Sequence, residues 1–166
     1  DALRARLLAR PFQAAVSGGL LELLSAHATG DLDARTLKLA RLAASVTAGC
    51  PFCIDMNANE HAEAGLSLDD LDAALDPARW GRFEGRDGAA MRFARAMSTT
   101  PVEIDPAMKA EIAAQFSPRE VVVLATAAAQ VNYWARLNQA LGVPAAGFVF
   151  APGDRCVAAP RPVAPE

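Results

Sequence analysis

Two cysteines separated by two residues are the side chains of this sequence best suited to chemistry; they form the run Cys50-Pro51-Phe52-Cys53. A CxxC motif brings its sulfurs within disulfide reach when the first cysteine lies at a helix N-terminus, and Pro51 fits the first turn of a helix. The free N–H groups and the helix dipole at that end stabilise a thiolate. A thiolate attacks a peroxide or a disulfide, and the neighbouring thiol resolves the product. The motif therefore predicts redox chemistry.

Two other interpretations of these cysteines remain open from the motif alone. They can be buried as small apolar residues without reacting, or they can belong to a zinc site. Structural zinc takes four nitrogen or sulfur ligands, but the chain has no second CxxC, and only His27 and His61 could contribute. We therefore expect no metal. Cys156 lies in a proline-rich end and is expected to be a bystander thiol.

Composition points to one helical domain without nucleic-acid or membrane partners. Ala supplies 38 of the 166 residues, whereas Val, Ile and Thr together supply 20, which favours helices over strands. The net charge is -3 and no basic run occurs, contrary to the basic patch of a nucleic-acid binder. The most apolar run, residues 121–131, rises only about 16 Å as a helix, too short for a bilayer. Residues 1–10 lack a signal-peptide core, so we expect a soluble, cytoplasmic protein.

Helix signals lie on both sides of the cysteines. Asp33 is a capping residue for a helix that runs to about Ala48 and ends at Gly49. The helix that contains the cysteines is expected to run to about Ala64, before Gly65. The remaining expected elements are a short helix at 20–28, a capped helix at 68–75, a loop that includes 76–77 and 81–88, and helices at 87–97 and 105–116.

The last helix has the clearest start in the sequence. Ser117 can cap it, Pro118 suits its first position and Glu120 can complete a capping box, and it is expected to continue to Leu141. Its first half is apolar on every side, which is typical of a helix buried in a core or between subunits. The pattern therefore predicts a homo-oligomer. We assign residues 1–149 to one domain and residues 150–166 to a proline-rich arm or tail.

The motif and its flanking helices resemble a known family. Residues 41–71, RLAASVTAGCPFCIDMNANEHAEAGLSLDDL, and the run NYWARLN at 132–138 followed by ALG are similar to alkylhydroperoxidase D-like proteins of the carboxymuconolactone decarboxylase superfamily. The resemblance covers most of residues 35–148. It implies an all-α helical bundle that assembles as a trimer or a dimer of trimers. It also implies reduction of small organic hydroperoxides without metal or haem, by a thiol cycle that a lipoyl-bearing or thioredoxin-type protein recharges.

The resemblance assigns roles to the cysteines, but this sequence lacks the family's proton relay. By resemblance, Cys53 attacks the peroxide and Cys50 resolves the product, although the helix-dipole argument by itself favours Cys50 as the more acidic thiol. The family has a His four residues after the second cysteine and a Glu twelve residues before the first. Those positions hold Asn57 and Lys38 here. Asn takes no proton at neutral pH, and Lys carries the opposite charge from Glu.

Other polar residues are candidate substitutes for the relay. His61 lies eight residues after Cys53, about 12 Å along a helix and beyond direct reach. Asp55 and Glu60 are either substitute bases or carboxylates that the start of the helix favours. On the last helix, the polar and aromatic side chains either line the site or serve as core and surface residues; they are Tyr133, Trp134, Arg136 and Asn138.

Three functions are compatible with these features. The first is a thiol-dependent oxidoreductase that reduces organic hydroperoxides through Cys53 and Cys50. The second is a non-catalytic or slow redox-responsive scaffold of the same fold, since Lys38 and Asn57 replace the relay. The third is a decarboxylase or lactone-handling enzyme, an activity found in the same superfamily among members that generally lack the CxxC motif.

Overall fold

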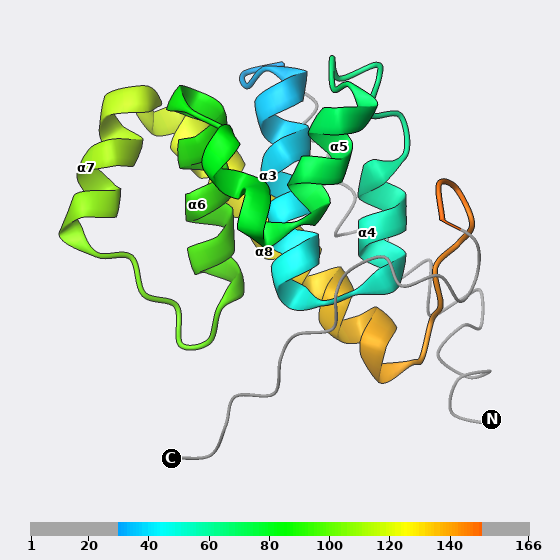
Figure 1. The fold of residues 1–166 in the computed structure, drawn as a ribbon. Helices are drawn as coiled ribbons and strands as arrows, with labels where there is room; N and C mark the ends of the chain where they lie inside the picture. The colour runs from blue at the N-terminus through cyan, green and yellow to red at the C-terminus, as the bar shows by residue number, and fades with distance from the viewer. Residues whose placement is uncertain (1–29, 151–166) are drawn as a thin grey trace. The chain divides into compact units, whose positions relative to one another are not determined.

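The structure is a computed structural model that describes residues 30–150, and every regular element within this range is a helix (Figure 1). The helices described here belong to one compact unit, which begins at Leu32. In chain order they are α3 (Ala34–Ala48), α4 (Pro51–Ala58), α5 (Leu68–Leu75), the 3-10 helix η1 (Pro77–Arg82), α6 (Gly85–Ser98), α7 (Pro106–Gln115) and α8 (Pro118–Ala140). The all-α prediction is confirmed for these residues. The expected helix at 20–28, His27, Cys156 and the tail beyond Phe150 lie outside them.

Side-chain caps start the helices where the sequence predicts. The Asp33 carboxylate accepts the Thr36 N–H at 2.8 Å and begins α3. Gly49 ends α3 with a φ of 64°, a left-handed conformation that costs glycine little. Capping boxes built on Ser67 and Ser117 begin α5 and α8. These local interactions explain why the predicted limits of the three helices agree with the structure.

The helix that carries the cysteines is shorter than predicted. α4 ends at Ala58 rather than near Ala64, and Asn59 already has an extended ψ of 147°. The Lys38 ammonium donates to the Asn59 carbonyl at 2.7 Å, so a side chain from α3 binds one of the free carbonyl groups at the end of α4. Residues 59–65 form turns instead, in which the His61 carbonyl accepts the N–H groups of Ala64 and Leu66.

The loop expected at 76–77 and 81–88 also contains regular structure. Residues 77–82 form η1, and α6 begins at Gly85 rather than Asp87. The Asp76 carboxylate starts η1 by accepting the Ala78 N–H. Trp80 is buried, with its indole N–H donated to the Ala74 carbonyl at 2.8 Å. Burial of this large aromatic side chain stabilises η1, because a short 3-10 helix has little intrinsic stability.

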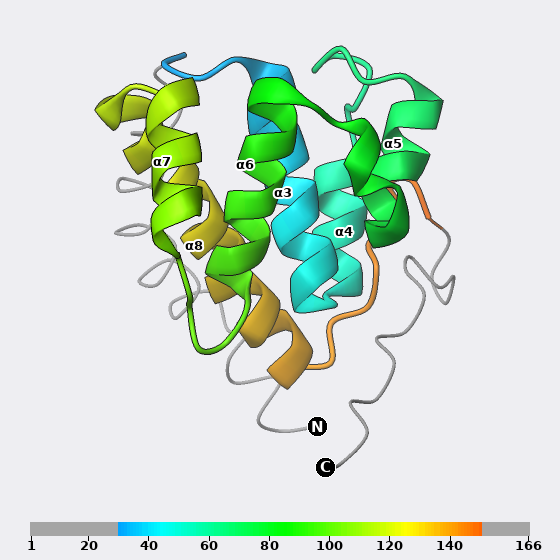
Figure 2. The ribbon, with the colours of Figure 1, turned by 60° about the vertical axis from the view of Figure 1, so that its left-hand side comes forward.

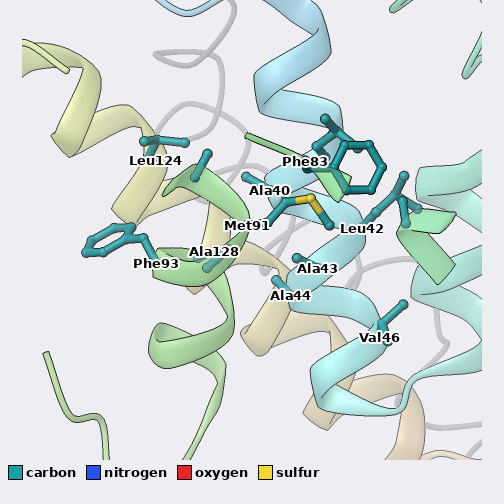
Figure 3. Packing of buried hydrophobic residues seen from close by; sticks show 14 of the residues in the cluster. Ala40, Leu42, Ala43, Ala44, Val46, Phe83, Met91, Phe93, Leu124 and Ala128 are labelled. Atoms are coloured by element: carbon teal, nitrogen blue, oxygen red, sulfur yellow. The ribbon is translucent and has the colours of Figure 1, made fainter. Parts of the chain in front are cut away.

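Small side chains allow α3 to lie between its neighbours at close range. α3 contacts α4, α5, α6 and α8, and alanines line the faces it shares with α6 and α8, among them Ala40, Ala43, Ala44 and Ala128 (Figure 3). Larger side chains, including Leu42 and Met91, fill the remaining space. Close-packed interiors resist displacement of their elements, so the C-terminal end of α3 is a rigid support for the cysteines that follow it.

Helix α8 extends from α7 at its start to α4 near its end (Figure 2). Its first half is not buried all round in the single chain, because Val122 is 65% exposed while Val123 and Leu124 are buried. The homo-oligomer inferred from this apolar surface remains a prediction. None of the helices within residues 30–150 is both long enough and apolar enough to cross a membrane.

Candidate functional site

The two cysteines lie at the turn between α3 and α4, joined in a disulfide. Gly49 redirects the chain, Cys50 is the N-cap residue of α4, and Pro51 is in its first turn. The Cα atoms of Cys50 and Cys53 are 5.3 Å apart. The Cys50 sulfur accepts the backbone N–H of Cys53 at 3.2 Å. The motif is therefore at a helix N-terminus, where a thiolate is stabilised.

The disulfide is covered by apolar side chains from three helices. Cys50 is 1% exposed and Cys53 is 4% exposed, and the fully buried Ala135 of α8 completes their cluster. Phe52 and Trp134 pack over this cluster and are themselves only partly buried. A group that reaches the sulfurs from this side would contact or displace these two rings.

Asn138 is the polar side chain of α8 that reaches the sulfurs. Its amide nitrogen lies 3.8 Å from the Cys53 sulfur, within hydrogen-bonding range for sulfur, and the residue is 8% exposed. Sequence reasoning noted Asn138 as one of several polar residues but did not assign it to the site. A usable signal was present, because Asn138 follows Ala135 by three residues and Trp134 by four and so shares their helix face.

The two positions of the family relay do not form a chain of proton carriers. Asn57 donates both amide hydrogens, to the Ser45 hydroxyl at 3.1 Å and to the Cys53 carbonyl at 2.8 Å. Lys38 donates to the Asn59 carbonyl rather than to Asn57 or a sulfur. These side chains tie α4 to α3, and neither provides a general base next to the disulfide.

Two basic side chains of α3, Lys38 and Arg41, are partly buried. Burial lowers the pKa of Lys38 below its ordinary value, and the charge of Arg41 lowers it further. The carboxylates of Glu60 and Glu63 raise this pKa but do not outweigh the burial. Burial also lowers the pKa of Arg41. Partly buried cations favour the ionised form of an acidic group nearby, although Lys38 does not reach the sulfurs.

The other candidates from the sequence lie apart from the sulfurs or have a separate role. The His61 Nδ1 atom lies 3.2 Å from the Ala58 carbonyl oxygen in the turn after α4. Tyr133 is 39% exposed and contacts Trp134 edge-on, with 5.1 Å between the ring centroids. It therefore supports the ring that covers the disulfide rather than the disulfide itself. Among residues 30–150, no three His, Cys, Asp or Glu side chains are arranged to hold a metal ion.

Asp55 has a role that the sequence did not indicate. It is fully buried on α4, and its carboxylate accepts four consecutive backbone N–H groups at 2.8 to 3.0 Å, from Gly147, Phe148, Val149 and Phe150. Burial by itself would raise the pKa of Asp55, but these four bonds outweigh it and hold the pKa below its ordinary value. Asp55 is an anchor for residues 143–150, which run back along α4 after α8 (Figure 1), and is neither a substitute base nor a first-turn cap.

The comparisons with known proteins agree with this architecture. Residues 12–96, a little over half of the chain, match the carboxymuconolactone decarboxylase family. The uncharacterized protein YnjA of Escherichia coli strain K12 is 32% identical over 121 residues, which are 73% of this chain and 65% of that protein. The chain thus spans slightly less than two thirds of this relative's length.

Solved structures show the same fold at low sequence identity. A protein of unknown function from Agrobacterium tumefaciens, proposed to be the antioxidant defence protein AhpD, has a TM-score of 0.66 and 22% identity over 80% of this chain and 94% of its own. The debrominase Bmp8 has a TM-score of 0.64 and 21% identity over 83% of this chain and 73% of its own. Its complex with 2,3,4-tribromopyrrole has a TM-score of 0.61 and 22% identity over 80% of this chain and 70% of its own. Together with the match over residues 12–96, this shared fold confirms the resemblance in the sequence: the chain belongs to the carboxymuconolactone decarboxylase family.

Proposed function

We propose that this protein is a thiol-dependent oxidoreductase that reduces small organic hydroperoxides by a dithiol–disulfide cycle of Cys53 and Cys50. The observation that carries the proposal is the Cys50–Cys53 disulfide at the start of α4, buried beneath Phe52 and Trp134. The cycle needs two cysteines that can form a disulfide and a site that stabilises a thiolate. This pair has both properties, because the sulfurs are bonded and lie at a helix N-terminus.

The cycle balances with one hydroperoxide and one external dithiol. The Cys53 thiolate attacks the terminal peroxide oxygen; an S–O bond forms, the O–O bond breaks, and the departing alkoxide takes a proton from water to give the alcohol. The Cys50 thiolate attacks the sulfur of the resulting sulfenic acid; the S–S bond forms, the S–O bond breaks, and the departing hydroxide takes a proton from the solvent to give water. The two cysteines have then lost two electrons to the peroxide. An external dithiol restores them by thiol–disulfide exchange.

Mass spectrometry of alkylated protein tests this function directly. Reduced protein carrying Cys156→Ser, which leaves two thiols, is treated with one equivalent of tert-butyl hydroperoxide and quenched with iodoacetamide over seconds to minutes. We expect rapid loss of both alkylation sites. We also expect a sulfenic acid at Cys53 in the Cys50→Ser variant and no peroxide consumption in the Cys53→Ser variant. Two thiols that stay free for minutes would overturn the proposal.

A slow redox-responsive scaffold is the second candidate function. Two observations favour it. Asn57 binds Ser45 and the Cys53 carbonyl, and Lys38 binds the Asn59 carbonyl. The sulfurs are therefore without the family's proton relay. It predicts a disulfide that forms over hours and does not turn over. A lactone-handling activity would instead persist in full after both thiols are alkylated.

The partners of the proposed enzyme follow from the same cycle. We propose a lipoyl-bearing or thioredoxin-type protein as the electron donor, in a reducing compartment such as the cytoplasm. We also propose a homo-oligomer, a trimer or a dimer of trimers, in which the exposed Val122 side of α8 is covered. Light scattering coupled to size-exclusion chromatography measures the subunit number, and a monomer would contradict this part of the proposal.

A further inference from the structure

The two sulfurs of the disulfide receive hydrogen bonds from different donors. The Cys50 sulfur accepts the Cys53 backbone N–H, which belongs to the helix N-terminus. The Cys53 sulfur instead faces the side-chain amide of Asn138, which comes from α8, 85 residues further along the chain. The backbone donor accompanies any CxxC motif in this position, whereas the amide donor depends on this residue of α8.

The Asn138 side-chain amide has the Cys53 sulfur as its hydrogen-bond acceptor. Within residues 30–150, the side-chain amide of Asn138 donates to this sulfur, and the residue is 8% exposed. A disulfide sulfur is a weak acceptor, but a thiolate is a strong one. The same contact therefore gains strength when the disulfide opens and negative charge develops on Cys53, without any need for the amide to move far.

Neighbouring contacts hold Asn138 in this position. The next residue, Gln139, donates its side-chain amide to the Ala48 carbonyl at 3.0 Å, which joins the last turn of α8 to the end of α3. The Asn138 carbonyl accepts the Val143 N–H at 2.9 Å. Three residues earlier, Ala135 packs against both cysteines with no exposed surface. A donor that is fixed before charge develops costs little reorganisation at the moment of reaction.

We propose that Asn138 is a catalytic residue whose amide N–H stabilises the Cys53 thiolate. This inference rests on the proposed function and assigns the chemical roles of the two sulfurs within it. The amide favours Cys53 over Cys50 as the nucleophile that forms the S–O bond with the hydroperoxide. It also favours Cys53 as the leaving sulfur when the reducing dithiol attacks Cys50, because a stabilised thiolate leaves faster.

Single-thiol proteins test the proposal without any peroxide. The double variant Cys50→Ser, Cys156→Ser leaves only Cys53, and the double variant Cys53→Ser, Cys156→Ser leaves only Cys50. Each receives Asn138→Leu, which removes the donor, or Asn138→Asp, which is nearly isosteric and places a carboxylate next to the sulfur. The rate of alkylation by iodoacetamide is measured from pH 5 to pH 10, and the midpoint of each profile reports ionisation of the remaining thiol.

The expected result is a shift confined to Cys53. A hydrogen bond to a charged group shifts the pKa of that group by about one unit. Asn138→Leu should therefore raise the midpoint of the Cys53 profile by about one unit and slow the alkylation of Cys53 at pH 7 about tenfold. Asn138→Asp should raise the midpoint further. The Cys50 midpoint should change by less than about 0.3 units, because its donor is the backbone of α4.

A second asparagine of α8 provides the matched control. Asn132 is also 8% exposed, but its amide donates to the Ser98 hydroxyl and the Ala128 carbonyl, away from the cysteines. Asn132→Leu should leave the Cys53 midpoint unchanged, and circular dichroism checks that each variant is folded. Unshifted Cys53 profiles in both folded Asn138 variants, or equal shifts at Cys50 and Cys53, would overturn the proposal. A shifted Cys53 profile in a protein that consumes no hydroperoxide would support this inference and refute the proposed function.

Discussion

The Asp55 anchor makes a quantitative prediction about stability. Asp55 Oδ2 accepts the Gly147 and Phe148 N–H groups, and Oδ1 accepts those of Val149 and Phe150. The substitution Asp55→Asn keeps one oxygen and turns an amide NH₂ group toward the other two donors. Two bonds to a buried charge are then lost at about 1.5 kcal/mol each, so the free energy of unfolding should fall by about 3 kcal/mol.

Urea denaturation followed by circular dichroism measures this loss. With a typical slope for a small domain, a loss of about 3 kcal/mol lowers the urea midpoint by between about 1 and 3 M while the slope stays constant. Asp72→Asn is the control, because Asp72 is an exposed carboxylate on α5, and it should change the free energy of unfolding by less than about 0.5 kcal/mol. Hydrogen exchange should show faster exchange of the four amides at 147–150 in the Asp55 variant.

The pH dependence of the free energy of unfolding distinguishes the effect of the Asp55 charge from other effects of the substitution. The pKa of Asp55 lies below its ordinary value of 3.8, so the native state favours the charged form and its contribution is complete above that value. As the pH falls below 3.8 and through the lowered pKa, the carboxyl group is protonated and the contribution is lost. The wild type and Asp55→Asn should therefore differ fully at pH 7, and the difference should narrow as the pH falls below 3.8. Equal urea midpoints at pH 7, or a difference that does not narrow in acid, would refute the reasoning.

Two further substitutions test the relay positions and the packing between η1 and α6. Restoring the family pattern with Lys38→Glu and Asn57→His should raise hydroperoxide consumption at least about tenfold, since general acid–base groups contribute about 10² to 10⁴; no gain in a stopped-flow assay would favour the scaffold function. Gly88→Ala places a Cβ atom 2.1 Å from the Phe83 carbonyl oxygen, and should lower the free energy of unfolding by about 3 kcal/mol. Gly81→Ala, whose Cβ meets no atom within 4 Å, is the control; equal melting temperatures for the two variants would contradict the clash.

Features that depend on neighbouring residues were predictable from the sequence. Asp33, Ser67 and Ser117 start their helices with bonds to N–H groups three residues away, and such bonds form wherever the local backbone is helical. The place of Cys50 and Cys53 at the start of α4 follows from Pro51 and from the break at Gly49 in the same way. This short-range information indicated redox chemistry as one interpretation of the cysteines, and the resemblance of the flanking helices to the family made it the leading prediction.

The contacts that define the site join residues far apart in the chain and follow from the tertiary structure alone. Lys38 binds the Asn59 carbonyl at the end of α4, Asp55 binds backbone groups more than 90 residues away, and Asn138 contacts Cys53, 85 residues earlier in the chain. Helical periodicity indicates which face a side chain occupies, but the partner of that face depends on how α8 packs against α3 and α4. That packing is set by alanines throughout the core, whose combined effect on helix position no local pattern reveals.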